Sequence, residues 1–119
     1  MKIFIGGDSG YDTHFKTIGE KFGPFDLTIL ECGQYNEYWQ YIHMMPEEVV
    51  QAAQDLKAKN FMPVHWGKFS LSLHDWDEPI IRVTEESKRE NVYIITPMIG
   101  EEVDLKSNYV STEWWKTIE

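Results

Sequence analysis

The sequence contains few of the features that disulfide-stabilised, nucleic-acid-binding or membrane-spanning proteins need. A single cysteine, Cys32, excludes an internal disulfide and suits a reducing compartment, so we expect a cytoplasmic protein in which this thiol is buried. Eleven Lys and Arg residues against 20 Asp and Glu give a formal net charge of −9, which disfavours nucleic acid as a partner. The apolar runs are too short for a membrane span or the core of a signal peptide.

The sequence is instead rich in material for a packed interior. Hydrophobic residues make up 42% and aromatic residues 14% of the 119 residues, which predicts one globular domain with one core. The first strand-like residues follow Met1 directly, and we interpret this abrupt start as a sign of truncation. Residues 107–119 include the adjacent Trp114 and Trp115, and we expect this aromatic tail to pack on the body or on a partner.

Short apolar runs alternate with amphipathic segments along the chain. Each apolar run predicts a strand, and each segment with apolar residues three and four positions apart predicts a helix. Residues 34–45, which are aromatic-rich without a regular period, predict a long loop. The alternation indicates an α/β fold with helices packed on a sheet. The predicted order is strand 2–5, helix 12–22, strand 26–32, helix 46 to near 60, strand 60–65, helix 78–89, strand 92–96 and strand 102–105.

Two loops place metal-competent side chains at the ends of predicted strands. Asp8 lies in a glycine-rich loop after the first strand, and His65 ends a later one. Open α/β sheets keep their sites at the carboxyl ends of strands, and a carboxylate with an imidazole can share a divalent metal ion that activates water. From the residues alone, Asp8 is equally well explained as a turn or helix-capping residue, and His65 as a core histidine. Two ligands are too few for a stable zinc site.

The residues around these loops resemble the second half of metallo-β-lactamase-fold hydrolases. The resemblance rests on Gly7-Asp8-Ser9-Gly10-Tyr11, residues 22–27, His43 before Pro46-Glu47-Glu48, and Val64-His65-Trp66-Gly67. The order of these motifs is similar to that in the N-acyl phosphatidylethanolamine-hydrolysing phospholipase D branch, with L-ascorbate phosphate lactonases more distant. The resemblance implies half of an αββα sandwich, with a mixed sheet and helices packed on it.

The resemblance also implies a role for each matched residue. In that family the aspartate of the first loop bridges two zinc ions and the histidine of the His-Trp-Gly loop binds one, which assigns metal binding to Asp8 and His65. The histidine before the Pro-Glu-Glu helix contacts the substrate, so Asp8 and His43 are the expected catalytic residues and His43 also binds substrate. Tyr35 and Trp39, in the aromatic loop, are candidates for lining the substrate pocket, and core or interface packing explains them equally well.

The chain lacks the other half of the family's metal site. The family's His-x-His-x-Asp-His motif is absent, and the only histidines are His14, His43, His65 and His74, of which we interpret His14 and His74 as ordinary solvated residues. We therefore expect weak or no zinc binding and no hydrolysis by the chain alone. The resemblance implies that the complete fold holds two zinc ions and hydrolyses a phosphodiester or lactone with zinc-bound hydroxide.

Two functions remain open from the sequence. In the first, the chain is the carboxy-terminal half of a metal-dependent hydrolase of a small ester or phosphodiester, and it pairs with a separately encoded amino-terminal half or with a second copy as a homodimer. In the second, it is a non-catalytic α/β module for oligomerisation or partner binding. Both predict a partner, because half of a sandwich leaves apolar sheet surface exposed.

Overall fold

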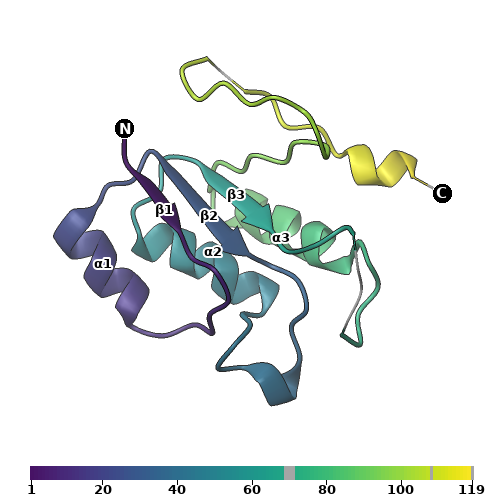
Figure 1. Cartoon of the computed structure of the whole chain (residues 1–119), viewed down its shortest axis with the longest axis horizontal. Coiled ribbons are helices and arrows are strands. Elements are labelled where there is room, and N and C mark those ends of the chain that lie inside the picture. Colours follow the sequence, from purple (N-terminus) through teal and green to yellow (C-terminus); the bar gives the residue numbers. More distant parts are fainter. Residues whose placement is uncertain (69–71, 108, 119) are drawn as a thin grey trace.

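The computed structural model describes residues 1–68, 72–107 and 109–118. Within them the chain forms a three-stranded sheet of order β1-β2-β3 with helices packed on one face, which confirms the α/β prediction (Figure 1). The elements are β1 (Ile3–Ile5), α1 (His14–Phe22), β2 (Leu27–Glu31), the 3-10 helix η1 (Glu37–Trp39), α2 (Pro46–Asp55), β3 (Phe61–Val64), α3 (Glu78–Arg89) and the 3-10 helix η2 (Trp114–Thr117).

β2 is the central strand of this sheet. Leu27 pairs with Ile3 of β1, and Thr28 pairs with Phe61 of β3. Both pairings are parallel, so the described strands do not form the mixed sheet that we expected. The reason is that each strand leads into a helix, and such a crossover returns the chain in the same direction. Most of β2 is buried, in part because α2 packs on the sheet there, which explains its apolar sequence.

α2 covers β2 and contacts both α1 and α3. It begins at Pro46, which suits the first turn of a helix, and the Glu48 carboxylate accepts a hydrogen bond from the Met45 backbone N–H at 2.9 Å. It ends at Asp55 rather than near residue 60 as the sequence predicted. The difference arises because Lys57 has a φ of +56°, a left-handed conformation that cannot continue a helix.

α3 matches its predicted range and buries Ile80 and Val83 completely. Its exposed side carries charged residues, and the helix is amphipathic as its sequence pattern predicts. Among the described residues, no helix is long and apolar enough to cross a membrane.

The last two predicted strands do not form as expected. In residues 92–96 only Ile94 bridges to the sheet, opposite Phe61, with Phe61 N–H donating to the Tyr93 carbonyl at 3.0 Å and Ile95 N–H to the Phe61 carbonyl at 2.7 Å. The bridge does not extend because the next residue placed to donate to β3 is Pro97, which has no N–H, while Thr96 N–H, on the other edge, bonds to the Ser111 hydroxyl at 3.1 Å. Residues 102–105 form no strand, and that prediction is wrong. The chain turns there, with the Asp104 carbonyl accepting a hydrogen bond from the backbone N–H of Ser107 at 3.3 Å.

The sheet face opposite the helices is apolar. Phe4 and Phe61 pack into the core beneath the helices. Because side chains alternate along a strand, the register places Ile5 and Ile29 together on the other face. Ile5 is 72% exposed, and α1, α2 and α3 lie on the opposite face of the sheet (Figure 1). An exposed apolar sheet face of this kind fits packing against another sheet.

The carboxy-terminal segment returns to the loop that follows β3. The Trp66 ring stacks on Trp114, with ring centroids 5.4 Å apart, and meets the edge of Trp115 at 5.7 Å. Trp115 is only 2% exposed. This cluster of Trp66, Trp114 and Trp115 anchors the segment directly beside His65.

The loop after β1 is tied to the end of α2 by one hydrogen bond. The Tyr11 hydroxyl donates to Asp55 Oδ2 at 2.5 Å. This hydrogen bond, together with partial burial and the nearby negative charge, raises the pKa of Tyr11 to about 12. The folded chain therefore holds the hydroxyl proton more tightly than the unfolded chain does.

The substitution Tyr11→Phe tests this tie. A raised folded-state pKa means that the stabilisation is complete below the ordinary tyrosine pKa of about 10 and is lost as the pH rises towards about 12. Because the ring is half-exposed, we expect the loss in unfolding free energy to be only about 1 kcal/mol. Urea denaturation between about pH 9 and 11.5 should show a larger loss in the unsubstituted chain than in the variant, which keeps only the contributions of Tyr35 and Tyr109, whose pKa values are also raised by burial and by the neighbouring Glu78 and Glu101.

Tyr38→Phe is the matched control, because Tyr38 is 87% exposed. It should leave the pH dependence unchanged. If the Tyr11→Phe variant loses as much unfolding free energy at high pH as the unsubstituted chain, the hydrogen bond to Asp55 is not the cause of the loss.

Candidate metal centre

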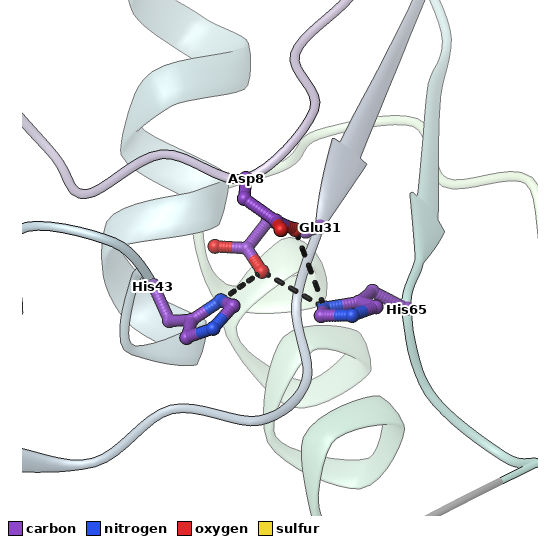
Figure 2. A group of neighbouring side chains, drawn as sticks. All are labelled: Asp8, Glu31, His43 and His65. Carbon is purple, nitrogen blue, oxygen red and sulfur yellow. Dashed lines mark hydrogen bonds and ion pairs between the residues drawn. The ribbon is translucent and has the colours of Figure 1, made fainter. Parts of the chain in front are cut away.

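Four metal-competent side chains meet at the carboxyl edge of the sheet (Figure 2). Asp8 follows β1, Glu31 is the last residue of β2, His65 follows β3, and His43 lies in the loop before α2. The strands of a parallel sheet all end at the same edge, which brings together residues that are distant in sequence. One potential ligand atom from each residue lies within 4.8 Å of those of the other three.

Glu31 lies at the centre of this group. Its Oε2 atom is 2.6 Å from His43 Nδ1 and 3.0 Å from His65 Nδ1, so two imidazoles share one carboxylate oxygen. Asp8 is at the margin, with Oδ1 3.9 Å from His65 Nδ1. Figure 2 shows the Glu31 carboxylate between the two rings. The structure therefore brings Asp8, His43 and His65 together and adds a fourth residue.

Glu31 is a buried carboxyl group, 2% exposed. Burial raises the pKa of Glu31, and the hydrogen bonds from His43, His65 and the Met44 backbone N–H act in the opposite direction. The Met44 N–H reaches Oε1 at 3.2 Å, so both carboxylate oxygens have donors. A buried charge without such partners would be strongly destabilising.

The backbone of β2 and that of the His65 loop approach each other closely. A Cβ atom added at Gly33 would lie 1.9 Å from the His65 carbonyl oxygen, so only glycine fits there. His65 itself has a φ of +69°, a left-handed conformation that is unfavourable for a residue with a side chain. The fold accepts this strain at a position that directs an imidazole towards Glu31.

A similar close approach fixes the Asp8 loop. Gly10 N–H donates to the Tyr41 carbonyl at 3.1 Å, and a Cβ at Gly10 would lie 2.1 Å from the Gln40 carbonyl oxygen. The loop after β1 is thereby held against the segment that carries His43. Two glycines thus set the spacing of the three loops around the site.

The four residues lie beside a cleft of about 330 Å³. Asp8, His43 and His65 line it together with Gln34, Trp39 and Ile42. The Trp39 ring meets His43 edge-on, with centroids 6.1 Å apart. Trp39, which the sequence suggested as a substrate contact, therefore forms part of the cleft wall.

Tyr35, the other suggested substrate contact, lies elsewhere. It is 6% exposed, its hydroxyl donates to Glu78, and its ring stacks on His74 with centroids 4.4 Å apart. The Arg82 guanidinium lies over the same ring. Tyr35 thus joins the aromatic loop to α3 and lines a neighbouring pocket.

The two remaining histidines also lie outside the group. His14 Nε2 is 3.3 Å from the Ser9 hydroxyl, at the start of α1. His74 Nε2 accepts a hydrogen bond from the Gln34 backbone N–H at 2.8 Å. The interpretation of His74 as an ordinary solvated residue is therefore incomplete, because it supports the loop after β2.

Sequence reasoning missed Glu31. The sequence pattern of residues 26–32 predicts only an apolar strand, and it does not single out Glu31 as a site residue. The charge of Glu31 was the available signal. Carboxylates are almost never fully buried without partners, so a glutamate at the carboxyl end of a central strand indicates a site that supplies them.

The donor set suits a divalent transition metal ion. Two imidazoles and two carboxylates are among the ligands that zinc takes, and four is its usual coordination number in proteins. In the described part of the chain, this is the one such group of three or more side chains. The residues present therefore fit one metal ion.

A family model described as the beta-lactamase superfamily domain matches residues 1–66, which is more than half of the chain. The chain belongs to the metallo-β-lactamase superfamily. The matched residues include all four members of the candidate metal centre. The resemblance inferred from the sequence is confirmed at the level of the family.

Relatives extend well beyond this chain. An uncharacterized protein of Mycobacterium tuberculosis is 41% identical over 118 residues, which cover 97% of this chain and 32% of that protein. The mitochondrial N-acyl-phosphatidylethanolamine-hydrolyzing phospholipase D of Saccharomyces cerevisiae is 42% identical over 81 residues, covering 65% of this chain and 17% of that enzyme. The chain thus spans a third or less of these relatives and is a partial metallo-β-lactamase domain.

A solved structure shows the same fold. Igni18, a metallo hydrolase from the archaeon Ignicoccus hospitalis, superposes with a TM-score of 0.63 and 20% sequence identity. The match covers 84% of this chain and 40% of that one. YhfI of Bacillus subtilis, described as a metallo-beta-lactamase fold protein, superposes with a TM-score of 0.58 and 18% identity over 80% of this chain and 36% of that one, so the parallel sheet and its helices form part of a metallo-β-lactamase fold.

The left-handed conformation of His65 gives a stability prediction. His65→Gly should be more stable than His65→Ala by about 1 kcal/mol, because alanine keeps the unfavourable φ of +69° and glycine does not. Urea unfolding of the two variants measures the difference.

Lys16 provides the control, because it is exposed within α1. There the order should reverse, with Lys16→Gly about 1 kcal/mol less stable than Lys16→Ala. Equal stabilities of the two His65 variants would mean that the loop relaxes and that the native backbone is not strained there.

Proposed function

We propose that this chain supplies part of the active site of a metal-dependent hydrolase that cleaves a phosphodiester or a lactone. The observation that carries the proposal is the convergence of Asp8, His43 and His65 on a buried carboxylate at the carboxyl edge of the sheet. Membership of the superfamily and homology to a phospholipase D support the reaction class. The substrate would be a small ester or phosphodiester.

The proposal gives each residue a role. Asp8 and His65 would hold zinc, and a bound zinc ion activates water for attack on phosphorus or on a carbonyl carbon. His43 stacks on His65 with centroids 5.4 Å apart and lines the same cleft, where its ring can hydrogen-bond with the phosphate or leaving group. Trp39, in the cleft wall, would contact the organic part of the substrate.

A two-zinc centre needs more ligands than this chain offers. The chain offers four metal-competent side chains at most, and two ions that also bind water need further donors from outside the chain. We propose that a separately encoded amino-terminal half supplies them. The greater length of the relatives and the exposed apolar sheet face around Ile3 and Ile5 support this partner. A homodimer would cover the same face without adding the missing motif.

The same face favours a second candidate function, a non-catalytic module for partner binding. Ile3 and Ile5 are 47% and 72% exposed, which is unusual for residues of a sheet. The two functions predict the same docking surface and differ in whether the complex binds metal and hydrolyses an ester.

Zinc titration of the purified chain tests the metal site. We expect at most one zinc ion per chain, held by the group around Glu31. Asp8→Asn and His65→Gln should each weaken binding roughly tenfold or more, because each removes a ligand. Isothermal titration calorimetry against a competing chelator measures the affinity.

His14→Gln is the matched control, since it removes a histidine that lies outside the group. Its affinity for zinc should equal that of the unsubstituted chain. Zinc binding that is insensitive to Asp8→Asn and His65→Gln would place the metal elsewhere and contradict the assignment.

Complementation tests the activity. The chain would be mixed with the part of the Mycobacterium tuberculosis relative that lies outside the matched segment, and bis(p-nitrophenyl) phosphate and a γ-lactone would be offered as substrates. We expect hydrolysis of at least one by the mixture, none by either part alone, and none when the chain carries Asp8→Asn. A stable, zinc-loaded complex without hydrolysis would overturn the catalytic proposal and favour the binding module.

A further inference from the structure

One oxygen atom holds both imidazoles of the site. Glu31 Oε2 lies 2.6 Å from His43 Nδ1 and 3.0 Å from His65 Nδ1, while Oε1 receives the Met44 backbone N–H at 3.2 Å. An ionised carboxylate can only accept hydrogen bonds. Three donors therefore converge on one buried side chain, and two of them are ring nitrogens from different loops.

The distances identify these contacts as hydrogen bonds. Two ligands of one tetrahedral zinc ion, each about 2.0–2.1 Å from the metal, lie about 3.3 Å apart. The separation of 2.6 Å between Glu31 Oε2 and His43 Nδ1 is shorter and falls in the range of charge-assisted hydrogen bonds. Glu31 is thus a hydrogen-bond acceptor for both rings. It is not a third ligand that would bind the metal ion beside them.

We propose that Glu31 is a positioning residue that accepts the Nδ1–H of both His43 and His65 and thereby fixes both rings in the Nδ1-protonated tautomer. Which nitrogen of a histidine carries the proton is set by the partner of the other nitrogen. With Nδ1 engaged, Nε2 of each neutral ring keeps its lone pair. The two rings also stack with an interplanar angle of 29°, so Glu31 sets their orientation as a pair.

This assignment has chemical consequences for both histidines. Metal ions bind the unprotonated nitrogen, so His65 would use Nε2 as its ligand atom. The neutral His43 ring can accept a proton through Nε2 but cannot donate one from that atom. These consequences rest on the proposed hydrolase function, whereas the tautomers themselves do not.

Glu31→Gln reverses the chemistry of the central group at almost constant size. The amide oxygen can still accept from Met44 N–H, as Glu31 Oε1 does. The amide nitrogen would then face the two rings with two N–H donors where the carboxylate had an acceptor. Both imidazoles would have to present a lone pair at Nδ1 and carry their protons on Nε2.

The experiment is 15N NMR of the histidine rings in the metal-free chain at about pH 8, which is above the ordinary histidine pKa of about 6.5. We expect His43 and His65 to be Nδ1-protonated in the unsubstituted chain and Nε2-protonated in the Glu31→Gln variant. His43→Asn and His65→Asn assign the signals. His14 is an internal reference, because its ring lies outside the group and should be unchanged.

Glu20→Gln is the matched control. It replaces a carboxylate by an amide, as Glu31→Gln does, but at an exposed position of α1 away from the site. It should leave all tautomers as they are. Nε2-protonated His43 or His65 in the unsubstituted chain overturns the proposal, even if Glu31→Gln fails to fold. Unchanged tautomers in a folded Glu31→Gln variant overturn it as well.

Zinc affinity provides a second readout. A residue that orients a ligand through its other nitrogen typically contributes 10-fold to 100-fold in metal affinity, and we expect a loss of about that size for Glu31→Gln. If neither the chain nor its mixture with the amino-terminal half binds zinc, the proposed function fails, while the tautomer result still decides the role of Glu31. If the tautomers reverse and zinc affinity is unchanged, Glu31 does not position the metal ligand, and that part of the proposal is overturned.

Discussion

The arrangement of this molecule depends on a buried carboxylate at the end of its central strand. Glu31 is satisfied only when the loop before α2 and the His65 loop are both in place, because the first supplies two of its three hydrogen-bond partners, His43 and the Met44 N–H, and the second supplies His65. A buried carboxylate that loses its partners is destabilised by several kcal/mol. The positions of the loops are thus coupled to the sheet through one side chain, and the functional edge of the fold is also a structural junction.

The fold was largely predictable because its signals are local. Alternating apolar runs and amphipathic segments identified β1, β2, β3 and the three α-helices, and α3 was placed to the residue. The errors came where distant groups decide the backbone. A Ser111 hydroxyl binds the Thr96 N–H at the outer edge, where a further strand would have paired, and a left-handed Lys57 shortens α2. Neither can be read from periodicity.

The site was predictable in part because some of its residues also have local signals in the sequence. Asp8 and His65 stand at strand ends, and the rule for parallel sheets brings such residues together. Glu31 was missed because its strand was identified by its apolar neighbours, and Tyr35 lies away from the cleft because a partner on α3, Glu78, binds its hydroxyl. The position of the Tyr35 ring depends on a contact with a residue more than forty positions away in the sequence. No local sequence pattern contains such a contact.

The tryptophans give the molecule an optical reporter of its own. Trp66 follows His65 directly and packs with Trp114 and Trp115, while Trp39 meets the His43 ring. Four of the five indoles therefore adjoin the two histidine loops. Intrinsic fluorescence, which usually averages over a whole protein, is here concentrated around the edge where metal, substrate and partner would bind, so that events at this edge become visible without any label.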